Sequence, residues 1–103
     1  RSAISAMSKQ IAIELARHKV RVNQVMPGAT GTDRMKNIMA AKAAANHTSA
    51  DEETERAVRE IPLGRWAEPE EIAAAVAFLV SPKSAFTSGA TLQLDGGAIR
   101  ATI

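Results

Sequence analysis

Apolar residues recur at every third or fourth position near the start of the chain, at Ile4, Met7, Ile11 and Leu15. This spacing places them on one side of a helix predicted over residues 2–17. Other apolar residues broaden that surface beyond a single stripe: Ala3, Ala6, Ala12 and Ile13. A helix with so wide an apolar surface is expected to lie between a sheet and another helix, away from bulk water.

Two short runs are typical of strands. Residues 19–26 (KVRVNQVM) are rich in β-branched side chains and are followed by Pro27 and Gly28, so a strand is predicted that ends there. Residues 90–94 predict a second strand, which is closed by Asp95 and two glycines.

The long segment between these strands is helical in composition but weakly apolar. A polar turn at residues 46–48 interrupts it, and His47 in this turn is expected to face solvent. Ser49 followed by Glu52 is a capping-box signature, which predicts that a new helix begins there.

A last helix is predicted to begin at Pro69, because a missing N–H is tolerated in the first turn of a helix. Its buried side is expected to carry Ile72, Val76, Leu79 and Val80. The order helix, strand, helices, strand is an α/β pattern, and a helical connection of about 60 residues implies that the two strands pair in parallel. Two parallel strands leave a sheet face and an edge uncovered, so further strands are expected from outside these residues.

Composition narrows the possible functions. The chain is 46% apolar and 23% charged, which is ordinary for one folded domain and excludes a disordered segment. The net charge of +2 comes from scattered basic residues, which disfavours a nucleic-acid-binding protein. No run approaches the roughly 18 apolar residues of a membrane span. The lack of cysteine excludes thiolate metal sites and is compatible with a reducing, cytoplasmic location.

Nearly the whole chain resembles the C-terminal part of the short-chain dehydrogenase/reductase family. The resemblance is carried by four segments in family order: ELARHKVRVN, RVNQVMPGATGT, IPLGRWAEPEEIAAAVAFLVS and LQLDGG. It implies that residues 1–103 are the C-terminal portion of one Rossmann-like, doubly wound parallel α/β domain. It also implies that residues 33–61 are the substrate loop. The start at Arg-Ser-Ala-Ile is expected to be an interior position of a longer polypeptide.

The same resemblance implies a cofactor contact at the end of the first strand, beside the nicotinamide of NAD or NADP. Pro27 and Gly28 shape the turn, the backbone of Thr30 meets the carboxamide, and Thr32 contacts the carboxamide or the phosphates. The carboxyl ends of strands in open α/β sheets are where ligands generally bind. The spacing alone also allows a structural interpretation, in which the proline and glycines end a strand and Thr32 caps a helix that begins at Asp33.

A similar choice stays open for three apolar residues of the predicted substrate loop. Met35, Ile38 and Met39 either line an apolar pocket, which suits the adaptable methionine side chain, or pack at helical spacing.

The catalytic groups of the family are not recognisable in this chain. The family's hydride transfer depends on a tyrosine, a lysine four residues later and a serine on an earlier strand, and this sequence contains no tyrosine. Arg1 falls where the lysine is expected, although a guanidinium does not readily release a proton. The glycine loop that binds pyrophosphate is also missing. The resemblance therefore implies no catalytic residue here, and the isolated chain is expected to be inactive.

Two functions are compatible with these features. The first is a part of an NAD(P)-dependent oxidoreductase that reduces a small carbonyl or oxidises an alcohol and assembles as a homodimer or homotetramer. The second is a non-catalytic binding or oligomerisation module derived from such an enzyme.

Overall fold

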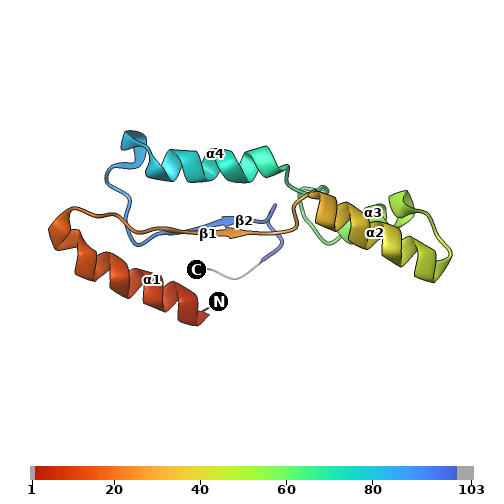
Figure 1. Ribbon diagram of the computed structural model, residues 1–103, viewed down its shortest axis with the longest axis horizontal. Coiled ribbons are helices and arrows are strands. Elements are labelled where there is room, and N and C mark those ends of the chain that lie inside the picture. The colour runs from red at the N-terminus through yellow and green to blue at the C-terminus, as the bar shows by residue number, and fades with distance from the viewer. Residues whose placement is uncertain (1, 100–103) are drawn as a thin grey trace.

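The computed structural model describes residues 2–99, in which two parallel strands lie between helices (Figure 1). In chain order the elements are α1 (Ser2–Leu15), η1 (Ala16–His18), β1 (Gln24–Pro27), α2 (Asp33–Asn46), α3 (Ala50–Val58), α4 (Pro69–Val80), η2 (Pro82–Ser84) and β2 (Thr91–Leu94). Helices α1 and α4 lie on opposite sides of the strand pair, and α2 and α3 extend beyond its end. The predicted order and the parallel pairing are confirmed.

The first strand is shorter than predicted. It begins at Gln24, because the residues before it bond to the end of α4 and the turn that follows. Lys19 has a left-handed φ of 63°, which ends the preceding turn of helix. The Arg21 guanidinium donates hydrogen bonds to the carbonyl oxygens of Leu79 (2.8 Å) and Thr87 (3.2 Å). Arg21 therefore satisfies the Leu79 carbonyl near the carboxyl end of α4, which has no partner within the helix, and ties it to Thr87 beyond η2.

The bulky stripe of α1 faces outward, contrary to the prediction. Ile4, Met7 and Ile11 are 55%, 58% and 40% exposed. The more protected side lies one position further along the helix and consists of small residues, Ser5, Ser8 and Ala12. Of the predicted stripe, only Leu15 is half-buried. The prediction that both sides of α1 are covered is therefore wrong for residues 2–99.

The predicted buried side of α4 is only partly correct. Leu79 is buried and Ile72 is half-buried, but Val76 and Val80 are 43% and 75% exposed. The exposed valines face a region that this part of the chain does not cover.

The molecule is extended for its size. Its principal extents are 57 × 25 × 21 Å, with a Cα radius of gyration of 17.1 Å. A compact domain of this length has a radius of gyration of about 13 Å. The exposed surface is 7429 Å², whereas a folded monomer of this mass exposes about 5,600 Å². The chain therefore leaves apolar surface without an intramolecular partner. No helix within residues 2–99 has both the length and the apolarity needed to cross a bilayer.

Candidate functional site

The carboxyl ends of β1 and β2 meet at one edge of the sheet, and glycine allows them to approach closely. The Gly28 N–H donates to the Leu94 carbonyl oxygen at 2.9 Å. A Cβ atom at position 28 would lie 2.8 Å from both Cα and Cβ of Asp95, a distance that real Cβ contacts essentially never show. The predicted turn at Pro27 and Gly28 therefore lies in close contact with the end of β2.

The loop after β1 is held against the segment that leads into α4. Ala67 accepts a hydrogen bond from the Gly31 N–H (2.8 Å) and donates one to the Ala29 carbonyl (3.1 Å). These bonds form an isolated parallel bridge between Thr30 and Ala67. In such a bridge the residues on either side of Thr30 make the bonds, so the Thr30 N–H and carbonyl point away from Ala67. The Thr30 hydroxyl donates to the Gly28 carbonyl at 3.1 Å.

Thr32 lies at the start of α2 and caps it. Its hydroxyl oxygen accepts a hydrogen bond from the Met35 N–H at 3.3 Å, which satisfies one of the free donors of the first helical turn. Thr32 therefore caps the helix that begins at Asp33, as the structural interpretation expected. The same residue lies only two positions from Thr30, so all four predicted cofactor contacts belong to one continuous segment at the sheet edge.

Two other predictions of the sequence have clear outcomes. His47 is exposed and ends α2 with a left-handed φ of 54°, so its prediction as a solvent-facing residue is confirmed. Met39 is only 3% exposed, which identifies it as a packing residue, while Met35 and Ile38 are half-buried. Arg1 lies outside the described residues.

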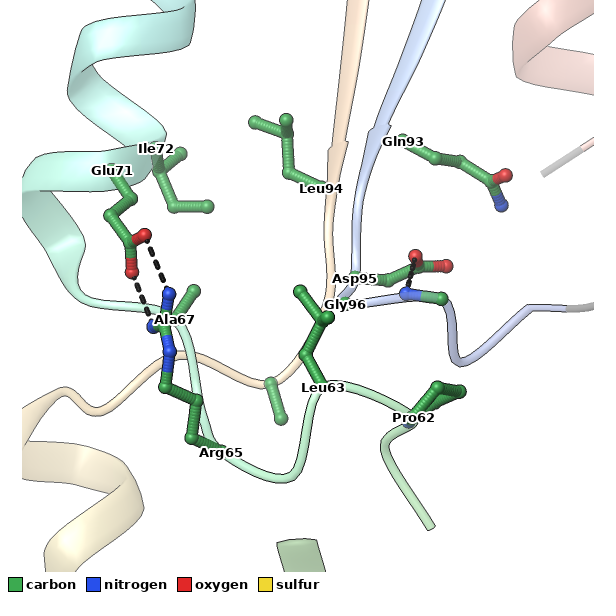
Figure 2. Close-up of a pocket in the computed structure, with 12 residues that line it drawn as sticks. Pro62, Leu63, Arg65, Ala67, Glu71, Ile72, Gln93, Leu94, Asp95 and Gly96 are labelled. Atoms are coloured by element: carbon green, nitrogen blue, oxygen red, sulfur yellow. Dashed lines mark hydrogen bonds and ion pairs between the residues drawn. The ribbon is translucent and has the colours of Figure 1, made fainter.

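A cavity of about 530 Å³ lies beside this segment, between the end of β2 and the start of α4. Figure 2 shows Leu63, Ile72 and Leu94 directed into it. The remaining lining residues are Ala29, Pro62, Arg65, Ala67, Glu71, Gln93, Asp95, Gly96 and Gly97. Of the loop after β1, only Ala29 lines the cavity; the four predicted contact residues do not.

An ion pair stands at the border of the cavity. Arg65 binds the Glu71 carboxylate through two parallel hydrogen bonds, Nη1 to Oε1 at 2.7 Å and Nη2 to Oε2 at 2.9 Å (Figure 2). The Glu68 N–H also donates to Glu71 Oε1, at 2.8 Å. The hydrogen bonds from Arg65, followed by the one from Glu68, lower the pKa of Glu71 from 4.5 to about 2. The pair thereby fixes the segment before α4 to the first turn of that helix.

Asp95 turns the chain at the end of β2. Its carboxylate oxygens accept from the Gly97 N–H at 3.0 Å and the Ile99 N–H at 3.1 Å. The sequence predicted that Asp95 closes the second strand, and these two bonds show how it does so. Sequence reasoning assigned no role to the Arg65 and Glu71 pair. Two local signals indicate these roles: an aspartate before two glycines, and a glutamate three residues after the residue that caps the predicted helix.

Comparison with known proteins gives a consistent result. A model of the family described as "Enoyl-(Acyl carrier protein) reductase" matches residues 1–98. The chain is 38% identical over 97 residues to D-erythrulose reductase of Gallus gallus, with 94% of this chain and 36% of that protein covered. It is equally similar to 3-oxoacyl-[acyl-carrier-protein] reductase FabG of Vibrio cholerae, 38% identical over 97 residues, with 94% and 35% covered. The chain thus spans about a third of the length of these relatives.

Solved structures support the same fold. A short chain dehydrogenase family protein from Francisella tularensis superimposes with a TM-score of 0.87 at 41% identity, over 94% of this chain and 40% of the other. L-sorbose reductase from Gluconobacter frateurii, complexed with NADPH and L-sorbose, gives a TM-score of 0.90 at 26% identity, over 98% and 39%. The prediction that this chain is part of a Rossmann-like α/β fold is confirmed.

Proposed function

This chain belongs to the short-chain dehydrogenase/reductase family, and we propose that it is the C-terminal portion of an NAD(P)-dependent oxidoreductase. The complete protein transfers hydride between the nicotinamide and a small carbonyl or alcohol. The observation that carries this proposal is the match over residues 1–98 to proteins about three times as long. The uncovered faces of the strand pair and helices support it, since parallel sheets are normally covered on both sides.

The loop after β1 is the proposed cofactor contact. The Thr30 N–H points away from its bridge to Ala67, and among residues 2–99 it has no hydrogen-bond acceptor. It is therefore a donor suited to the carboxamide oxygen of a nicotinamide, which supplies or accepts the hydride when bound. Gly28 and Pro27 keep the backbone close to the end of β2, and the Thr32 hydroxyl contacts the carboxamide or phosphates. NAD and NADP are both compatible with this part of the molecule.

Catalysis belongs to the complete protein in this proposal. The sequence contains no tyrosine, so the family's general acid or base comes from the remaining part of the polypeptide. The isolated 103 residues bind neither cofactor nor substrate productively. A cytoplasmic location stays a prediction that rests on the lack of cysteine.

We also propose that the complete protein is a homo-oligomer and that the outward stripe of α1 is part of its interface. Ile4, Met7 and Ile11 lie at helical spacing and are 40% or more exposed, and apolar stripes of this kind mark interaction surfaces. Met7→Glu is expected to shift the full-length protein to a smaller species in sedimentation. Gln10→Glu changes an exposed position of the same helix and is the matched control.

The test of the function uses the full-length protein. NADPH and NADH binding is measured by cofactor fluorescence, and hydride transfer by loss of reduced cofactor with D-erythrulose or L-sorbose as carbonyl probes. Cofactor binding with turnover of either carbonyl is the expected result. Assembly without binding of either cofactor would refute the oxidoreductase proposal and favour the non-catalytic module.

A further inference from the structure

Helices α2 and α3 form a body with its own small core, separate from the strand pair. They lie side by side beyond the end of the sheet (Figure 1). Two of the buried apolar residues among residues 2–99, Met39 (3% exposed) and Ala43 (8% exposed), lie in α2. This pair of helices therefore packs chiefly on itself.

The same body contains a buried carboxylate. Glu53 of α3 is only 4% exposed, and glutamate is almost never so buried unless its charge is matched by partners. Its Oε1 atom accepts hydrogen bonds from Thr48 Oγ1 at 2.7 Å and Asn46 Nδ2 at 3.1 Å. Arg56 Nη1 lies 3.5 Å from the same oxygen. The hydrogen bond from Thr48, then that from Asn46, lowers the pKa of Glu53, so the group stays ionised near neutral pH.

These donors come from the far end of α2. Asn46 is its last residue and Thr48 belongs to the turn that follows, so Glu53 ties the end of α2 to the interior of α3. The other end of α2 begins directly after Thr32, its cap. At 1.5 Å per residue, a helix of this length separates Asn46 from Thr32 by about 20 Å. Glu53 bonds at the end of α2 that lies far from Thr32, so it can influence Thr32 only through the helices.

Two segments of chain, residues 28–32 and 59–68, join this helix pair to the rest of the molecule, and we call them the neck. On the outgoing side the neck is closed by the bridge between Thr30 and Ala67. On the returning side the Leu63 N–H donates to the Gly96 carbonyl at 3.1 Å. The orientation of α2 beyond this neck depends on its attachment to α3, because no other described element packs closely on the pair.

We propose that Glu53 is a positioning residue: by locking α2 to α3, it holds the start of α2, and with it Thr32, in one orientation beside the cofactor. This inference rests on the proposed function. Glu53 acts only through the helix pair. Its loss lets α2 move at the neck, which disperses the orientations of the Thr32 hydroxyl.

The test compares substitutions in the full-length protein. Glu53→Leu removes the acceptor and leaves the donors of Thr48 and Asn46 unpaired. Glu53→Gln keeps an oxygen at the position that accepts the hydrogen bonds from Thr48, Asn46 and Arg56. Glu55→Gln makes the same change as Glu53→Gln, but at an exposed position of α3, and is the matched control. Thr48→Val removes only the shortest bond and supplies the measurement where Glu53→Leu does not fold.

Two quantities are measured for each variant. One is the affinity for NADPH, at a temperature well below the melting temperature, and the other is the rate of amide hydrogen exchange. Glu53→Leu is expected to weaken NADPH binding roughly tenfold and to speed exchange in α2 and α3 together, because unpaired partners of a buried charge are costly. Glu53→Gln should restore affinity to within about twofold, because it keeps the accepting oxygen. Exchange in β1 and β2 should not change.

The outcomes separate this inference from the proposed function. Unchanged NADPH affinity in Glu53→Leu, with faster exchange in the helix pair, would show a purely structural residue and overturn the positioning role. Unchanged exchange in α2 would overturn the lock itself. A wild-type protein that binds neither NADPH nor NADH would instead overturn the proposed function, and the positioning role with it.

Discussion

Replacement of Gly28 by alanine probes the close contact between the ends of β1 and β2. The added Cβ would lie 2.8 Å from Cα and Cβ of Asp95, and ordinary contacts begin at 3.4 Å. The strand ends therefore have to separate by about 0.6 Å, and backbone atoms cannot yield as the tip of a flexible side chain does.

The cost is that of overpacking a well-packed position, about 1–3 kcal/mol of unfolding free energy. In a domain of 150–250 residues each kcal/mol corresponds to about 2–4 °C in melting temperature. The separation also displaces the loop that carries Thr30, so weaker NADPH binding should accompany the loss of stability.

Gly31→Ala in the same loop is the matched control. A Cβ there meets the Ala67 oxygen at 3.6 Å and Trp66 Cε3 at 3.7 Å, which are ordinary contacts. The control should change the unfolding free energy by no more than about 0.5 kcal/mol, or raise it slightly. Urea unfolding of both full-length variants decides the matter. Equal unfolding free energies for the two would refute the reasoning from the contact with Asp95.

Three further predictions concern stability. In the wild type, the Asn23 amide donates a hydrogen bond to the Thr87 carbonyl at 3.0 Å. A carboxylate cannot donate this bond, so Asn23→Asp should lower the unfolding free energy by about 1–3 kcal/mol. Met39→Ala, which opens space in the helix pair at a 3% exposed position, should cost about 2–5 kcal/mol, measured by urea unfolding. Glu71 has a folded pKa of about 2 against its ordinary 4.5, so its contribution is fully present above pH 4.5 and is lost as pH falls toward 2. The difference in unfolding free energy between wild type and Glu71→Gln should therefore be smaller at pH 3 than at pH 6.

Each of these has a result that would contradict it. For Asn23 it is an Asn23→Asp variant as stable as wild type. For Met39 it is a decrease in unfolding free energy no larger than that caused by substituting alanine for an exposed residue. For Glu71 it is the same stability difference at both pH values, which would mean that the ion pair with Arg65 does not survive in solution.

Local chemistry explains why the helix ends were predictable. Ser49 accepts a hydrogen bond from the Glu52 N–H at 3.1 Å, as its capping signature predicted. Thr32 likewise caps α2. Such interactions span three or four residues, so the order of side chains is enough to specify them. The parallel pairing was predictable for a related reason, since a long helical connection brings the second strand back in the same direction.

Contacts between distant segments were not predictable in the same way. The predicted strand at residues 19–26 was too long, because Arg21 bonds to carbonyls near residues 79–87, about 60 positions away. The buried state of Glu53 depends on the fold of a turn between two helices, and nothing in its neighbours along the chain marks it as buried.

The sequence by itself determined the α/β class, the helix caps, the segment Pro27 to Thr32 as the candidate cofactor contact, and the family. These follow from periodicity and from motifs that are contiguous in the chain. Only the tertiary structure decided which face of α1 lies inward, how closely Gly28 approaches Asp95, and that Arg65 pairs with Glu71 beside a cavity. The physical reason is that amphipathic spacing identifies an apolar stripe but not its partner, while burial and close contact depend on segments brought together by folding.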